Sequence, residues 1–124
     1  MDVLAWILSG LLVAVFAAAG LTKLTSPREK LLANEQMAWV EDFHPGQVKA
    51  IGALEVLGAV GVVLPWLLDI APVLSAIAAL GLGAVMIGAM VTHQRRGELA
   101  KAGPINGTLL ALALVVAVLR FTML

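Results

Sequence analysis

Four long runs of apolar residues limit most strongly what this chain can fold into. Each run has about the 20 residues that a helix needs to cross a bilayer core about 30 Å thick. The runs extend over Val3–Thr22, Ala50–Leu68, Ile70–Thr92 and Ala102–Leu119, and Glu55 is the single charged residue within them. Because a backbone in lipid has to satisfy its hydrogen bonds internally, each run should be helical. The sequence therefore predicts an all-α, integral membrane four-helix bundle.

The composition excludes the main soluble alternatives. Hydrophobic residues make up 61% of the 124 residues and charged residues 13%, whereas a soluble domain of this size has about twice that charge and little volume in which to bury apolar surface. With no Cys, a disulfide framework, a thiol nucleophile and a Cys-ligated metal or iron–sulfur cluster are excluded. The net charge of zero provides no basic surface for nucleic acid.

We expect a single transmembrane domain over residues 1–124. The predicted spans cover residues 3–24, 48–68, 70–92 and 104–122. The first span also resembles a signal peptide with small residues at Ala17–Ala19. Its N-terminal region carries Asp2 and no Lys or Arg, however, so we expect it to be retained.

The basic residues predict the orientation of the bundle. Of the 8 Lys and Arg residues, all but Arg120 flank the connections between spans 1 and 2 and between spans 3 and 4. By the positive-inside rule, both connections should be cytoplasmic and both termini outside. Trp6 and Trp66 are then expected to be anchors at the outer interface, and Pro65 to end or kink the second span.

The first connection should contain a short helix on the membrane surface. Ser26-Pro27-Arg28-Glu29 has the order of a helix start, with Ser as the N-cap, and Pro45-Gly46 separates the segment from the next span. We predict one helix over residues 27–42. Its apolar side would comprise Leu31, Leu32, Ala38, Trp39 and Phe43, interrupted by Glu35.

Small residues at helical spacing predict three packing faces, because helices in lipid approach closely where side chains are small. The faces are Gly10, Ala14 and Ala18 on the first span, Gly52, Glu55, Gly58, Ala59 and Val62 on the second, and Ile77, Gly81, Ala84, Gly88 and Thr92 on the third.

Glu55 is the residue that most suggests chemistry. A carboxylate within a span is costly and is a functional-site hypothesis by default. Two states are open: Glu55 is protonated because burial disfavours the charge, or it is ionised and paired with a cation. Lys23, at the same end of the first span, is the expected partner. A purely structural pair and a ligand-binding group both fit these residues.

Other polar residues fall in the same cytoplasmic third of the spans. Besides Lys23 and Glu55, they are Gln47, Thr92, His93 and Asn106. His93 lies about 100° from the predicted packing face of its span, which weakens the case that it faces Glu55. His44 and His93 do not form a metal-binding or haem-binding motif, so neither group is expected. The outer two-thirds of the bundle should contain almost no hydrogen-bonding side chain, which argues against a channel.

Several motifs resemble those of the DoxX-like family. They are Phe16-x-x-x-Gly20-x-x-Lys23, Gly52-x-x-Glu55-x-x-Gly58 followed by Pro65, and the segment Gly88–His93. The resemblance implies a four-helix membrane bundle, with Lys23 and Glu55 matching the family's polar motif. It also implies a link to quinone oxidoreduction or stress, or a role as an assembly factor. We expect this bundle to lie in a bacterial inner membrane.

Three functions are therefore expected, in decreasing order of support. The first is an accessory or ligand-binding subunit with a Lys23/Glu55 pocket that binds a quinone-like or lipid-like molecule or docks a partner. The second is a structural or assembly factor for a membrane complex. The third is a small proton-coupled transporter, although the Glu of this chain lies in the second span, whereas small multidrug exporters carry theirs in the first helix. The sequence contains no catalytic constellation, so the chain is at most a subunit of an enzyme.

Overall fold

The structure is an all-α bundle of four long helices. The computed structural model describes residues 2–33 and 35–124, and no strand occurs among them. The long helices are α1 (Asp2–Thr25), α3 (Pro45–Leu67), α4 (Val73–Arg95) and α5 (Leu99–Thr122). All 4 are long and apolar enough to cross a membrane. The predicted fold class, an integral membrane four-helix bundle, is confirmed.

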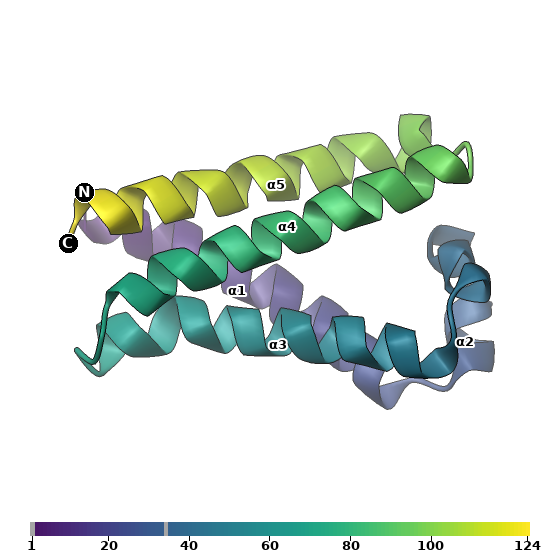
Figure 1. The fold of residues 1–124 in the computed structure, drawn as a ribbon, viewed down its shortest axis with the longest axis horizontal. Coiled ribbons are helices and arrows are strands. Elements are labelled where there is room, and N and C mark those ends of the chain that lie inside the picture. The colour runs from purple at the N-terminus through teal and green to yellow at the C-terminus, as the bar shows by residue number, and fades with distance from the viewer. Residues whose placement is uncertain (1, 34) are drawn as a thin grey trace.

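The helices run up and down in chain order (Figure 1). α1 packs against α3, α3 against α4 and α4 against α5, while α1 and α5 meet over a smaller area. Both termini and the α3–α4 connection lie at one end, which we call the terminal end. The short elements α2 (Arg28–Leu32) and η1 (Glu35–Asp42, a 3-10 helix) lie at the other, together with the α4–α5 connection. We call this the η1 end.

Two glycines let α1 and α3 touch through their backbones. A Cβ on Gly20 would lie 2.6 Å from the carbonyl oxygen of Gly52, and a Cβ on Gly52 would lie 2.8 Å from that of Gly20. No real side chain tolerates such a distance to backbone, so glycine is required at both positions. This contact sets the register of α1 against α3.

An apolar core fills the middle of the bundle. Its largest members include Leu12 and Phe16 of α1, Leu82 and Met86 of α4 and Val116 of α5. Leu82 fits against Gly58, where a Cβ would lie 2.5 Å from a methyl group of Leu82. This core lies along the helices between the two ends.

Of the three predicted packing faces, the face on α3 is correct. Gly52, Glu55, Ala59 and Val62 are buried. The faces predicted for α1 and α4 are wrong. Gly10, Ala14 and Ala18 are exposed, and so are Ile77, Gly81, Ala84 and Gly88. Lipid is as apolar as the core, so small size alone does not mark the inward face. On α4 the inward face is displaced from the predicted one and mixes small, large and polar residues, namely Ser75, Ala76, Ala79, Leu82, Gly83, Met86 and His93.

The single helix predicted over residues 27–42 is also wrong, because the structure has two short pieces there. α2 begins after Pro27 without a side-chain cap, and η1 follows. An unbroken helix would hold Arg28 and Phe43 about 22 Å apart, whereas Arg28 Nη1 donates to the Phe43 carbonyl at 2.7 Å. The fold-back also buries Leu31 of α2 against Val40 of η1 and Val48 of α3.

The long helices differ from the predicted spans mainly at their starts. α5 starts at Leu99, ahead of the predicted residue 104, and includes Pro104, while α4 starts at Val73. Pro65 lies inside α3, which continues to Leu67.

Candidate functional site

A buried ion pair joins α1 and α3 near the η1 end. Lys23 Nζ lies 2.6 Å from Glu55 Oε1, and Glu55 is 2% exposed. The Gly20–Gly52 contact explains the geometry. The stem of Lys23 passes over Gly52, where a Cβ would lie 2.8 Å from Lys23 Cβ. Of the two states open from the sequence, the contact supports the paired one.

The ion pair lines a cavity of about 790 Å³ at the η1 end. Its walls come from all four long helices and from η1, and most of its lining is apolar, including Phe16, Ile51, Met86 and Leu109. The polar lining residues are Lys23, Glu55, Thr92, His93, Glu98 and Asn106. The structure thus brings together four of the five site residues expected from the sequence.

His93 and Asn106 reach this cavity from α4 and α5. They are 8% and 9% exposed. The offset of His93 from the predicted packing face of α4 weakened the case that it faces Glu55, yet both residues line the cavity. That face was a poor reference, because Gly81 and Ala84 are exposed while Thr92 lines the cavity. Within the described part of the chain, His93 Nδ1 and Asn106 Nδ2 have no hydrogen-bond partner. His93 Nδ1 lies 4.0 Å from Glu98 Oε2.

η1 and Phe43, the residue after it, form an aromatic wall of the cavity. Trp39 and Phe43 meet edge to face, with ring centroids 5.5 Å apart. Lys23 Nζ lies 5.8 Å from the centre of the Trp39 ring, close enough for a cation–π attraction. Met37 completes the contribution of η1. The connection between spans 1 and 2 is therefore part of the site.

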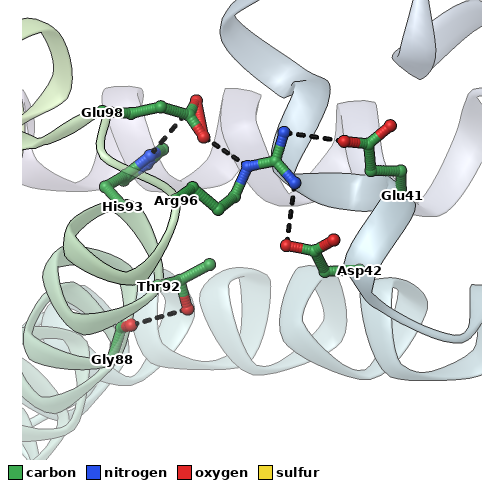
Figure 2. Close-up of polar contacts among 7 residues, drawn as sticks. All are labelled: Glu41, Asp42, Gly88, Thr92, His93, Arg96 and Glu98. Carbon is green, nitrogen blue, oxygen red and sulfur yellow. Dashed lines mark hydrogen bonds and ion pairs between the residues drawn. The ribbon is translucent and has the colours of Figure 1, made fainter.

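Arg96 ties η1 to the α4–α5 connection, as Figure 2 shows. Its guanidinium donates to Glu41 Oε1 and Asp42 Oδ2, each at 2.8 Å, and to Glu98. The hydrogen bonds that Arg96 donates to Asp42, then to Glu41 and Glu98, raise its pKa above the ordinary value. Glu98 lies between Arg96 and His93, so this cluster connects the outer surface of η1 with the cavity wall. Sequence reasoning used Arg96 only for orientation, although the acidic pair at Glu41 and Asp42 was a signal for a partner.

Gln47 does not line the cavity. Its Oε1 accepts a hydrogen bond from the His44 backbone N–H at 2.8 Å, and His44 Nδ1 accepts one from the Gly46 N–H at 3.1 Å. The two side chains form a capping box that begins α3.

A second buried polar cluster, missed from the sequence, lies at the terminal end. Arg120 is 0% exposed, and its Nη2 donates to Ser9 Oγ at 3.2 Å. Its guanidinium carbon lies 4.7 Å from the ring centre of Trp6 and 4.9 Å from that of Trp66. Both Trp residues thus flank a cation inside the bundle, in addition to lying near its end. The expectation of an almost apolar outer region was wrong.

Ser75 adds to the polar groups at this end, since its hydroxyl donates to the Val62 carbonyl. A Ser or Arg in an apolar run is a sequence signal for an inward face in lipid. Ser9, Ser75 and Arg120 would have been found by that rule.

The arrangement at the η1 end is suited to binding a small molecule. Among the residues described, no three His, Asp or Glu side chains gather in a way that could hold a metal ion. The cavity instead combines apolar walls with a few convergent polar groups, which is typical of sites for small organic molecules.

A comparison of the sequence with protein families matches the DoxX-like family over residues 7–116. The matched region contains Lys23, Glu55, His93 and Asn106. No curated protein sequence and no solved structure matches the chain. Since the family match covers most of the 124 residues, the chain belongs to the DoxX-like family of membrane proteins.

Proposed function

We propose that this protein is a ligand-binding subunit of the membrane, and that the cavity beside Lys23 and Glu55 holds an apolar molecule with a polar head. The cavity itself is the observation that carries the proposal. Its volume of about 790 Å³ falls within the range of about 300–1,000 Å³ common for small-molecule sites. Buried polar atoms converge on it from α1, α3, α4 and α5.

A quinone is the first ligand to test. Its ring would stack on or lie beside Trp39, its oxygens would lie near Lys23, His93 and Asn106, and its apolar tail would follow the walls toward lipid. The DoxX-like resemblance, which implies a link to quinone oxidoreduction, also favours a quinone. In this proposal the chain binds and orients the quinone, and a partner subunit supplies the redox chemistry.

A cavity-filling variant tests the proposal. Ala19 lines the cavity, whereas Ala14 is exposed on another face of the same helix. In lipid nanodiscs, the unmodified protein and Ala14→Phe should bind decylubiquinone or another neutral amphiphile saturably, and Ala19→Phe should not. Unchanged binding by Ala19→Phe would place the ligand elsewhere. A stoichiometric protein partner in the absence of any ligand would favour an assembly factor.

A proton-coupled transporter has less support. The buried residues between the cavity and Arg120 form the apolar core around Leu12, Ala59, Val62 and Leu82. A permeation route would need polar lining through that layer.

We also propose that the protein lies in a bacterial inner membrane with the η1 end toward the cytoplasm, as the basic residues indicate. The chain lacks Cys, so single cysteines can report the orientation. In intact cells, Asp69→Cys should react with an impermeant maleimide and Lys30→Cys should not. The reverse labelling would contradict this orientation.

A further inference from the structure

Two buried polar atoms in the cavity wall have no hydrogen-bond partner in the described ranges 2–33 and 35–124. They are Asn106 Nδ2 and His93 Nδ1, and both residues line the cavity. A buried donor without an acceptor costs about 1–3 kcal/mol, so such groups are rare in native proteins unless a ligand or water satisfies them. The two atoms therefore indicate the chemistry of an occupant.

Three charged groups that line the cavity, Lys23, Glu55 and Glu98, already have partners within the protein. The ammonium of Lys23 is engaged by Glu55 at 2.6 Å. The carboxylate of Glu98 is engaged by Arg96. A charged ligand head would have to displace one of these partners in a poorly solvated site, which is costly. These existing pairs favour an uncharged head.

The amide nitrogen of Asn106 specifies the head further. A carboxamide nitrogen can only donate, so its complement is an acceptor oxygen. The unpartnered ring nitrogen of His93 can form a hydrogen bond with a second polar atom. The neighbouring Ile105 and Leu109 lie on the same helix and also line the cavity, so an apolar body can extend from that oxygen.

Building on the function proposed above, we infer that the cavity selects an uncharged ligand whose carbonyl oxygen accepts a hydrogen bond from Asn106. Asn106 is then the specificity-determining residue, and His93 binds a second polar atom of the head. Quinones and glycerol esters share this chemistry. Both join carbonyl groups to a long apolar chain.

A matched pair of lipids isolates the carbonyl. 1-Oleoylglycerol and 1-oleylglycerol ether have the same head and closely similar chains, and they differ in the ester carbonyl. In nanodiscs, the protein should bind the ester about tenfold more tightly than the ether, as expected for one well-made buried hydrogen bond. Asn106→Leu should bind the two lipids equally. Thr108→Val, at an exposed position on α5 outside the cavity lining, should keep the preference.

Two further probes distinguish the sources of the carbonyl and test the charge. Displacement of the ester by decylubiquinone at lower concentration would identify a quinone, and weaker displacement would identify a glyceride. Oleate should bind more weakly than the ester, and tighter binding of oleate would overturn the uncharged head.

The outcomes separate this inference from the function on which it rests. Equal binding of ester and ether by the unmodified protein would overturn the carbonyl preference and leave a ligand-binding protein. A lack of binding by the ester, the ether and decylubiquinone would overturn both. Should Asn106→Leu fail to fold, the side-chain amide resonances of Asn106 in the unmodified protein give the answer. They should shift with the ester and stay unchanged with the ether, and equal shifts would contradict the inference.

Discussion

Lys23 Nζ and Glu55 Oε1 lie 2.6 Å apart in the interior of the bundle, joining two helices whose backbones touch one turn away. The pair connects fold and site. The residues that dock α1 on α3 are also residues that line the cavity.

The ion pair predicts that substitutions of Lys23 and Glu55 have non-additive effects on the unfolding free energy. Breaking a buried pair leaves one charge uncompensated, at a cost of about 3–5 kcal/mol. Lys23→Met should therefore lower the unfolding free energy by about 3 kcal/mol, whereas adding Glu55→Gln to it should restore most of the loss. Reversible unfolding in mixed micelles measures the unfolding free energies of the unmodified protein, the two single variants and the double variant, and these four values give the coupling. Additive effects of the two substitutions would mean that the pair contributes no coupling.

The contact between Gly20 and Gly52 predicts that a larger residue is destabilising at Gly52 and tolerated at an exposed glycine. Gly52→Ala should destabilise the bundle, because the added carbon would meet the Gly20 carbonyl oxygen and Lys23 Cβ, each at 2.8 Å. Gly81→Ala is the matched control, since Gly81 is exposed and a Cβ there has nothing within 4 Å. Because Ala favours a helix over Gly by about 1 kcal/mol, Gly81→Ala should be neutral or stabilising. Thermal unfolding compares the two, and similar losses would contradict the contact.

The contacts of Arg96 predict that η1 loosens when they are removed. Arg96→Gln should increase backbone hydrogen exchange over residues 37–43, because it removes the bonds to Glu41 and Asp42. Arg95→Gln, at the exposed neighbouring position, should leave exchange unchanged. In about 1 M salt, where the Debye length is about 3 Å, the unmodified protein should move toward the Arg96→Gln result. Equal exchange in both variants would show that η1 is held by its apolar contacts alone.

The raised pKa of Arg96 predicts how this tether depends on pH. A cation whose pKa is higher in the folded state contributes stability below its unfolded pKa and loses it as pH rises through the folded value. For Arg96 that loss falls above the usable range, so η1 should stay tethered up to about pH 11. With Arg96→Lys, the tether should begin to weaken as pH rises above about 10.4, the ordinary pKa of lysine. Hydrogen exchange, corrected for its intrinsic pH dependence, would show the two profiles.

The cluster at the terminal end should support the fold and leave the ligand site unaffected. Arg120→Lys loses the planar stacking between Trp6 and Trp66, since an ammonium does not stack as a guanidinium does. We expect a loss of about 1–2 kcal/mol in unfolding free energy and an unchanged dissociation constant for the cavity ligand. A changed dissociation constant with unchanged stability would instead show that the terminal end is coupled to the ligand site.

The sequence was sufficient for the fold because lipid imposes long apolar helices, and for the pairing of Lys23 with Glu55 because a carboxylate within a span needs a partner. It was insufficient for the faces of α1 and α4. Gly10 and Gly81 lie on exposed faces, because an apolar solvent does not separate inward from outward positions as water does. Polar residues such as Ser75 and His93 are the better guide to the inward face.

The connection between α1 and α3 shows a second limit of prediction from the sequence. Trp39 and Phe43 were expected on a helix at the membrane surface, but the bonds from Arg28 to the backbone of residues 41 and 43 and the burial of Val40 fold the segment back over the cavity. Arg120 was missed because its position near the chain end resembles an interfacial anchor. Tertiary contacts between distant residues determine both arrangements, and local patterns do not contain them.

The central claim is that an apolar ligand occupies the cavity beside Lys23 and Glu55. Photo-crosslinking of a diazirine-bearing neutral amphiphile in nanodiscs, with the modified residues mapped by mass spectrometry, tests it most directly. We predict saturable modification of Met37, Trp39 and Met86, which line the cavity, and its loss in Ala19→Phe. Modification confined to lipid-facing residues such as Leu57, which is 66% exposed, would contradict the account.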